Sequence, residues 1–345
     1  MDFQDNKPAD STQPQPLTPV YVPENKSKGS FRRIFWSIIL ILSVITNIIL
    51  FMMLMGIGVL VVTGQRGTLL EEVIREGPAG IKIAVVSIEG VIYDEQAENV
   101  YRQLKAARKD EQVKAVIVKI DSPGGTISAS DRIHQEILKF REQSKKPVIA
   151  FMQGTAASGG YYASVACEKI IAEPTTITGS IGVISSYLVL QELLENKLGV
   201  QPVVVKSGEK KDWPSSFRAP TEAEIDYIQN KLIKPSLEIF INVVAKGREK
   251  SLSLSEVRNL ADGSIFGAQE ALENKLIDDI GYLDDAVNLT KSISGIGDAQ
   301  VVRYRQPFSL GNLIGVESKQ NLLKINRNTL DELGTIQTLY LWSAF

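Results

Sequence analysis

Ser158 is placed where a nucleophile would be useful. It lies among small residues in the segment Gly154 to Tyr162, between a predicted buried strand and a predicted helix. A sharp turn there would expose the hydroxyl, and backbone N–H groups would point at whatever the hydroxyl attacks. Considered alone, such a serine is more often a helix N-cap. The segment therefore predicts a nucleophile only if a base and oxyanion donors accompany it.

The residue types available restrict the base. The chain has one histidine, His134, and one cysteine, Cys167, so a lysine is the favoured partner of the serine, as in Ser-Lys variants of the catalytic triad. Lys211 is the candidate. A lysine with the usual pKa of about 10.4 must lose its proton, which requires desolvation or a neighbouring cation. The adjacent Lys210 and the following Trp213 could supply both effects, and Lys210 is itself the alternative base.

Three glycine-containing turns follow apolar strands, at residues 121–125, 154–160 and 179–182. Ligands of α/β folds gather at the carboxyl ends of strands, and glycine lets a backbone N–H approach a developing oxyanion. Gly124 or Gly125 is one candidate donor, and Gly159 is the second. A phosphate loop is a poorer interpretation, because no Gly-Lys-Ser/Thr follows these turns.

The pattern along the chain is typical of an α/β layered fold, because short apolar runs alternate with amphipathic segments. We expect strands at 83–88, 114–120, 147–152, 169–172, 181–184 and 202–206. We expect helices at 95–109, 128–143, 158–166, 188–197 and 222–246, the last bent at Pro235.

An uncharged apolar run from Ile34 to Val62 is long enough to cross a bilayer. Basic residues crowd its N-terminal side, which predicts a cytoplasmic N-terminus, a single span in the cell membrane and a catalytic body outside the cytoplasm. A cleaved signal peptide fits less well, because the run is too long and some thirty residues precede it. We therefore expect a disordered cytoplasmic tail at 1–30, an anchor at 31–63 and a connector at 64–80 with a short helix at 68–75.

Composition excludes several classes of function. The chain has 345 residues, a net charge of -2 and no basic stripe with interleaved aromatics, so we expect no nucleic-acid partner. One cysteine cannot form an internal disulfide, and no cluster of His and Cys completes a metal site. We expect no metal and no cofactor.

Several ordered motifs together resemble the signal peptide peptidase A family, a membrane-anchored Ser-Lys protease family related to the Clp protease and crotonase fold. The motifs are residues Asp121–Gly125, Ala156–Tyr162, Thr178–Val183, Lys206–Asp212, Ala261–Gly267 and Ala271–Gly281. The likeness covers roughly Ile81 to Ala286, and the length matches the family's short form. It implies a Clp protease/crotonase-like layered α/β superhelix with one N-terminal transmembrane helix, and a peptidase domain at 81–295.

The resemblance also implies roles for individual residues. Ser158 would be the nucleophile, Lys211 the general base, and Ser180 the second serine that orients the lysine. The oxyanion hole would use the N–H groups of Gly124 or Gly125 and of Gly159. Short forms assemble as dome-like homo-oligomers, commonly octamers, with active sites at subunit interfaces. The implied substrates are peptides, namely remnant signal peptides and other exported chains.

Alternatives remain open at this point. An acyl-CoA enzyme of the crotonase type would share the fold, but would need CoA contacts and catalytic carboxylates. A non-catalytic oligomeric membrane scaffold would keep the fold without the activity, although it would not need all of Ser158, Ser180 and Lys211. A protease family that partners with stomatin-like proteins carries further spans after the protease domain, and none is seen after Val62. The apolar C-terminal tail, residues 296–345, either packs on the body or occupies the substrate groove and restrains activity.

Overall fold

The computed structural model describes residues 29–64, 69–305 and 337–342. The chain divides into two compact units, Met1–Thr63 and Gly64–Phe345. In the first, α1 (Gly29–Gly64) contains a 26-residue stretch, Phe31–Gly56, that is long and apolar enough to cross a membrane. The described side chains of α1 are exposed, as a lipid-facing helix requires. The predicted tail at residues 1–30 lies almost wholly outside the described residues.

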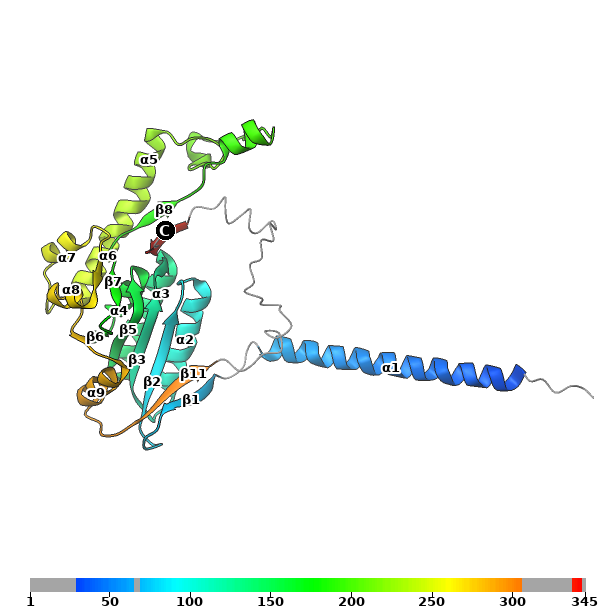
Figure 1. Ribbon diagram of the computed structural model, residues 1–345. Coiled ribbons are helices and arrows are strands. Elements are labelled where there is room, and N and C mark those ends of the chain that lie inside the picture. Colours follow the sequence, from blue (N-terminus) through cyan, green and yellow to red (C-terminus); the bar gives the residue numbers. More distant parts are fainter. Residues whose placement is uncertain (1–28, 65–68, 306–336, 343–345) are drawn as a thin grey trace, which may run out of the picture. The chain divides into compact units, whose positions relative to one another are not determined.

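A mostly parallel sheet forms the centre of the second unit (Figure 1). Its strands run in the order β1 (Leu70–Arg75), β11 (Gln300–Arg305), β2 (Lys82–Glu89), β3 (Val113–Ser122), β5 (Val148–Ala157), β6 (Lys169–Ala172) and β10 (Asp279–Ile280). Along this path only β1 is antiparallel to its neighbour. The first part of β5 pairs with β6, and its C-terminal end pairs with β7 (Ile177–Gly179). β7 pairs in turn with β9 (Ile265–Gly267).

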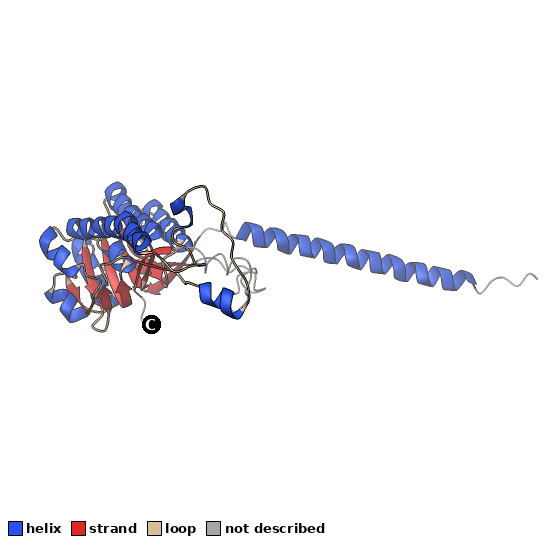
Figure 2. Ribbon diagram, turned by 90° about the horizontal axis from the view of Figure 1, so that it is seen from above, coloured by secondary structure: helices blue, strands red, loops and turns tan. Residues whose placement is uncertain are grey.

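Helices cover both faces of this sheet, which is why its central strands read as continuous apolar runs. Alternate residues of β2 point into different cores. Ala84, Val86 and Ile88 belong to the larger core, which packs under α2 (Asp94–Lys109), α3 (Ile127–Ser144), α4 (Gly159–Ser164) and α6 (Lys234–Gly247). Ile83 and Val85 face the smaller core with α9 (Leu283–Ser294). Figure 2 shows the main helical layer lying along the strands.

The carboxyl ends of β3, β5 and β7 bring the three glycine-containing turns to one edge of the sheet. A second, three-stranded sheet lies there, in the order β4 (Gly124–Thr126), β12 (Gln337–Leu341) and β8 (Ile184–Ser186). After β8 the chain leaves the sheet and returns at α5 (Glu222–Ile228), as Figure 1 shows. We call residues 187–221 the arm. It contains η1 (Leu193–Lys197) and η2 (Glu209–Asp212).

Most predicted elements are confirmed, with four corrections. The short helix expected at 68–75 is wrong, because this segment forms β1. The strand expected at 202–206 is also wrong, since these residues lie in the arm without regular structure and Val205 is 94% exposed. The helix expected at 188–197 shrinks mainly to η1, and the strand at 181–184 is replaced by β7 and β8. The long helix at 222–246 is present, and its π-helical turn η3 (Gln229–Ile233) precedes Pro235.

The flanks of the predicted peptidase domain also contribute to the sheet. β1 comes from the expected connector at 64–80, and β11 comes from the expected C-terminal tail. The two strands pair with each other, and Glu72 on β1 forms ion pairs with Arg303 and Arg305 on β11. This long-range pairing overrides the helical propensity of the Leu-Glu-Glu-Val segment.

Candidate active site

Ser158 lies at a sharp turn between β5 and α4, where the sequence predicts it. Its φ is 52° and its ψ is -112°, a backbone conformation that non-glycine residues rarely adopt. The turn is held at both peptide groups, because Ser158 N–H donates to Gly179 O at 2.8 Å and Ser158 O accepts from Tyr162 N at 2.8 Å. A non-glycine residue held in this region stores backbone strain, and such strain gathers at functional sites.

The Ser158 hydroxyl is buried and has no hydrogen-bond partner among the described residues. Leaving a buried polar group unpaired costs about 1–3 kcal/mol. Ser158 combines backbone strain with an unpaired buried hydroxyl, and both destabilise the fold. This combination indicates that the hydroxyl is positioned to interact with a further group, such as a substrate. A helix N-cap would bond its own helix, but Ser158 makes no side-chain cap bond, so the N-cap interpretation fails.

The glycine backbones of two separate turns meet beside Ser158. A Cβ added to Gly124, whose φ is 101°, would lie 2.7 Å from Gly159 N, and a Cβ on Gly159 would lie 3.1 Å from Gly125 N. Only glycine permits this close approach. Gly124 N–H already donates to Ser122 Oγ at 3.1 Å. Gly125 and Gly159 are therefore the better candidates for oxyanion donors.

Ser180 is brought next to this turn. Ala157 is in register with Gly179, so the residues that follow them, Ser158 and Ser180, lie side by side at the ends of β5 and β7. Ser180 is buried, has a φ of 49°, and donates its N–H to Ser264 O at 2.7 Å. Two serines with left-handed backbones thus lie together at one edge of the sheet.

Lys211 is the predicted site residue that does not lie with the others within a single chain. It lies on η2 in the arm and its side chain is exposed. Because Ser158 Oγ has no partner among the described residues, Lys211 does not hydrogen-bond it within one chain. Lys210 is committed elsewhere, since its Nζ lies 4.6 Å from the centre of the Tyr227 ring and 5.5 Å from that of Trp213.

The C-terminal strand β12 lies against these turns. It is antiparallel to β4 with Tyr340 opposite Gly125, and antiparallel to β8 with Leu339 opposite Ile184. The same added Cβ on Gly124 would lie 2.0 Å from Tyr340 O. The Tyr340 carbonyl and Gly159 N–H therefore border one small volume beside Ser158.

The side chain of Tyr340 is fully buried. Its ring stacks on Tyr162 at a centroid distance of 5.1 Å and lies 4.6 Å from that of Phe240, while its hydroxyl donates to Ser236 O at 2.8 Å. Sequence reasoning singled out the apolar tail but could not locate this contact, because the partners are distant in the chain.

Sequence reasoning missed Ser130 altogether. This α3 residue is buried, its hydroxyl has no partner among the described residues, and a Cβ on Gly159 would lie 2.4 Å from its Oγ. It lies four residues after the α3 N-cap, Thr126, at the start of the helix that follows the first glycine-containing turn, and this position is the signal that could have found it.

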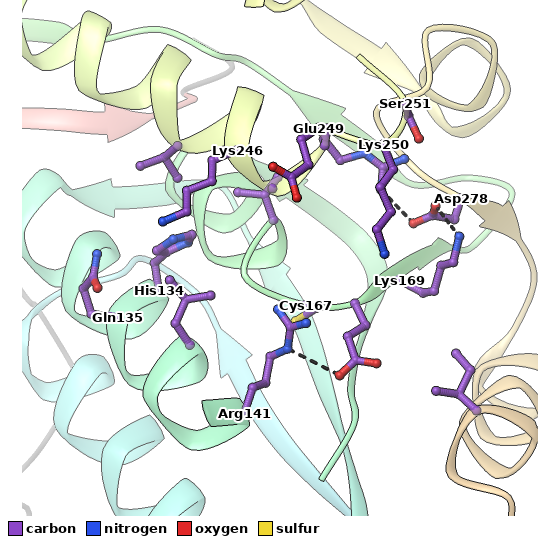
Figure 3. Close-up of a pocket in the computed structure, with 17 residues that line it drawn as sticks. His134, Gln135, Arg141, Cys167, Lys169, Lys246, Glu249, Lys250, Ser251 and Asp278 are labelled. Carbon is purple, nitrogen blue, oxygen red and sulfur yellow. Dashed lines mark hydrogen bonds and ion pairs between the residues drawn. The ribbon is translucent and has the colours of Figure 1, made fainter. Parts of the chain in front are cut away.

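His134 and Cys167 line a different pocket, of about 630 Å³, whose lining includes none of the predicted site residues (Figure 3). Burial lowers the pKa of His134, and its Nδ1 lies 3.0 Å from Tyr162 O. Burial raises the pKa of Cys167 to about 12. Neither residue is placed to deprotonate Ser158, which agrees with the expectation that the base is a lysine.

Comparison with known proteins agrees with this arrangement. The sequence profile of peptidase family S49 matches residues 140–296, and that of Clp protease matches residues 80–177. The chain is 40% identical over 246 residues to a protein of Enterococcus faecium that is provisionally named signal peptide peptidase SppA. The matched region covers 68% of this chain and 70% of that protein. The chain belongs to the SppA branch of peptidase family S49. It is therefore a serine peptidase with a Clp protease-like domain.

Longer relatives of this family match over part of their length. Protease 4 of Haemophilus influenzae is 36% identical over 61% of this chain and 35% of its own length. The chloroplastic serine protease SPPA of Arabidopsis thaliana is 33% identical over 58% of this chain and 29% of its own length. Family membership counts against both the acyl-CoA enzyme and the non-catalytic scaffold.

Proposed function

We propose that the chain is a membrane-anchored serine endopeptidase with a Ser158–Lys211 dyad, which degrades remnant signal peptides and other exported peptides outside the cytoplasm. The observation that carries the proposal is the buried, unpaired Ser158 hydroxyl on a strained turn, beside the close-packed backbones of Gly124, Gly125 and Gly159. This is the constellation that acyl transfer requires: a positioned nucleophile beside backbone donors.

In the proposed reaction, neutral Lys211 accepts the Ser158 proton as Oγ bonds to the scissile carbonyl carbon. The N–H groups of Gly125 and Gly159 stabilise the oxyanion. The Lys211 ammonium then gives its proton to the amine, and the C–N bond breaks. A water attacks the resulting ester, Lys211 takes a water proton, and Oγ leaves with that proton. Ser180, beside Ser158, would orient the lysine.

Lys211 of a second copy would complete the site. Lys211 does not reach Ser158 in one chain, and the arm that carries it exposes a run of apolar side chains without partners among the described residues, such as Val203 at 84% and Val205 at 94% exposure. Exposed apolar patches of this kind mark protein–protein contacts. A closed homo-oligomer, the octamer of the short form, would cover the arm and pair each Ser158 with a neighbour's Lys211.

An extended apolar peptide fits the strand position between β4 and β8. β12 already fills it by adding a strand, which is a common mode of peptide recognition. The closeness of Tyr340 O and Gly159 N to one point beside Gly124 supports a scissile carbonyl being presented there to the glycine N–H groups. The tail would therefore restrain activity by occupying the site. With α1 as the single anchor and a cytoplasmic N-terminus, the peptidase would act on the outer side.

The test is peptide hydrolysis by the full chain in detergent, with and without residues 326–345, on fluorogenic peptides with small and apolar residues. Ser158→Ala and Lys211→Ala should each reduce hydrolysis to a small residual rate while circular dichroism and sedimentation stay unchanged. Full activity in either variant would overturn the dyad, with Lys210→Ala as the next variant. An inactive but folded parent in both forms would overturn the peptidase proposal for this chain.

A further inference from the structure

The turn that bears Lys211 is anchored by the residue before it. Lys210 Nζ lies over the rings of Trp213 and Tyr227. These rings meet edge to face with centroids 5.6 Å apart. Because Tyr227 lies on α5, the contact fastens η2 to the helix that returns the chain to the body. A lysine ammonium held over aromatic faces is attracted by the ring quadrupoles. The side chain of Lys210 is therefore held at this contact with α5.

The residue after Lys211 is anchored as well. Asp212 accepts a hydrogen bond from Lys206 Nζ at 2.7 Å, and its other oxygen lies 3.5 Å from Arg218 Nε. The hydrogen bond from Lys206, followed by that from Arg218, lowers the pKa of Asp212. Arg218 also donates to Glu224 at 2.6 Å. Glu224 is fully buried and forms the capping box of α5, so this chain of ion pairs ends in a fixed element.

Lys211 lies between these two anchors. Its backbone N–H donates to Gly208 O at 3.1 Å. Among the described residues its side chain has no hydrogen bond or ion pair with a protein group. Glu209, on the same short helix, likewise has no side-chain partner in the part of the chain that the structure describes. The four residues of η2 thus divide into two anchored side chains and two uncommitted ones.

We propose that Lys210 and Asp212 are positioning residues that hold the backbone of Lys211 for proton transfer at Ser158. This inference rests on the proposed dyad. A base must come within about 2.6–3.2 Å of the proton it takes, and a displacement of about 1 Å can lower the rate about 100-fold. The surrounding arm has little regular structure to supply that precision, whereas Lys210 ties η2 to α5 directly and Asp212 does so through Arg218.

The test uses the full chain in detergent and a fluorogenic apolar peptide. Lys210→Met and Asp212→Asn should each lower kcat about tenfold or more with little change in KM, because they displace the proposed base and not the proposed strand position between β4 and β8. Lys210→Arg should restore most of kcat, since a guanidinium also stacks on aromatic faces. Glu209→Gln is the matched control on the same helix and should behave as the parent. Sedimentation should show the parent's assembly in every variant.

A second measurement separates positioning from general loss of structure. In a Lys211→Ala background, the residual rate should be unchanged by Lys210→Met, because residues that act through one group have non-additive effects. Parent-like kcat in both Lys210→Met and Asp212→Asn overturns the inference. So does a further fall in the Lys211→Ala background, or a failure of Lys210→Arg to recover kcat. Parent-like activity of Lys211→Ala alone would instead overturn the proposed dyad.

Discussion

At the scale of single residues, the site depends on how closely backbones can approach. A Cβ added to Gly159 would meet the Ser130 hydroxyl and the backbones of Gly124 and Gly125 together. The sequence predicted that the Gly-containing turns would converge, because parallel strands end at one edge of a sheet. It could not predict that Gly124 N–H would be taken by Ser122, since that choice depends on the local path of the turn.

Gly159→Ala should lower peptidase activity about 100-fold and cost about 1–3 kcal/mol of stability. The added Cβ would lie 2.4 Å from Ser130 Oγ and 3.1 Å from Gly125 N, so the donors must shift, and losing one oxyanion donor costs about 10²–10³ in kcat. The double variant Gly159→Ala with Ser130→Ala removes the closest contact and should recover part of the rate. Steady-state kinetics and thermal melts measure both effects. An unchanged kcat in Gly159→Ala would remove Gly159 from the oxyanion hole.

The Arg248–Asp278 ion pair gives a pH-dependent contribution to stability. Asp278 accepts from Arg248 at 2.7 Å and from Ile170 N at 2.8 Å. Burial alone would raise the pKa of Asp278, but the hydrogen bond and charge of Arg248 lower it on balance. A lowered folded pKa stabilises the fold above the unfolded pKa of about 3.9, and this contribution is lost as pH falls through the folded value.

Asp278→Asn should therefore lower the free energy of unfolding at pH 7 by about 3 kcal/mol, because it leaves Arg248 buried without its partner. The difference from the parent should shrink as pH falls below about 4. Denaturant unfolding across pH measures it. Asp298→Asn is the control, since its ion pair with Lys291 is exposed and worth less than about 1 kcal/mol. Equal effects of the two variants at pH 7 would contradict the prediction.

At the scale of elements, the sequence pattern predicted the strands and helices that depend mainly on interactions between neighbouring residues. The strands from 83 to 172 and the helices between them follow apolar periodicity, and they are confirmed. The failures are segments whose structure depends on distant partners. β1 forms because β11, some 230 residues later, lies beside it, whereas the β-branched run at 202–206 finds no strand partner in the described chain. Like β1, β12 forms a strand because it pairs with segments distant in the chain, β4 and β8.

Deleting residues 326–345 should raise the rate of peptide hydrolysis, mainly by lowering KM, because β12 no longer competes for the strand position between β4 and β8. Tyr340→Ala should do the same to a smaller extent, since it removes the ring buried against Tyr162 and Phe240. Deleting only residues 343–345 keeps β12 and is the matched control. Initial rates on one fluorogenic peptide compare the four chains. Unchanged rates in the longer deletion would dismiss restraint by the tail.

At the scale of the whole molecule, we propose that the dyad is divided between copies of the chain. One copy would supply Ser158 on a rigid sheet edge, and another would supply Lys211 on the arm. Such a division makes activity depend on assembly, so dilution should inactivate the peptidase before it unfolds. Strand patterns predicted that the glycine-containing turns meet at one edge of the sheet, whereas no pattern within one chain encodes a contact between two chains, so the position of Lys211 in space could not be predicted.

Mixing Ser158→Ala and Lys211→Ala chains should restore activity that neither has alone. In a closed ring with one type of contact, a site is active when a chain with Ser158 meets a neighbour with Lys211, so random mixing restores about a quarter of the sites. The chains are co-expressed with different tags, purified through both tags and assayed on the same peptide. A double variant, Ser158→Ala with Lys211→Ala, mixed with Lys211→Ala chains is the control and should stay inactive, because it supplies no lysine. If the first mixture also stays inactive while sedimentation shows mixed oligomers, Lys211 does not act on a neighbour's Ser158, and the arm would have to fold back within its own chain to complete the site.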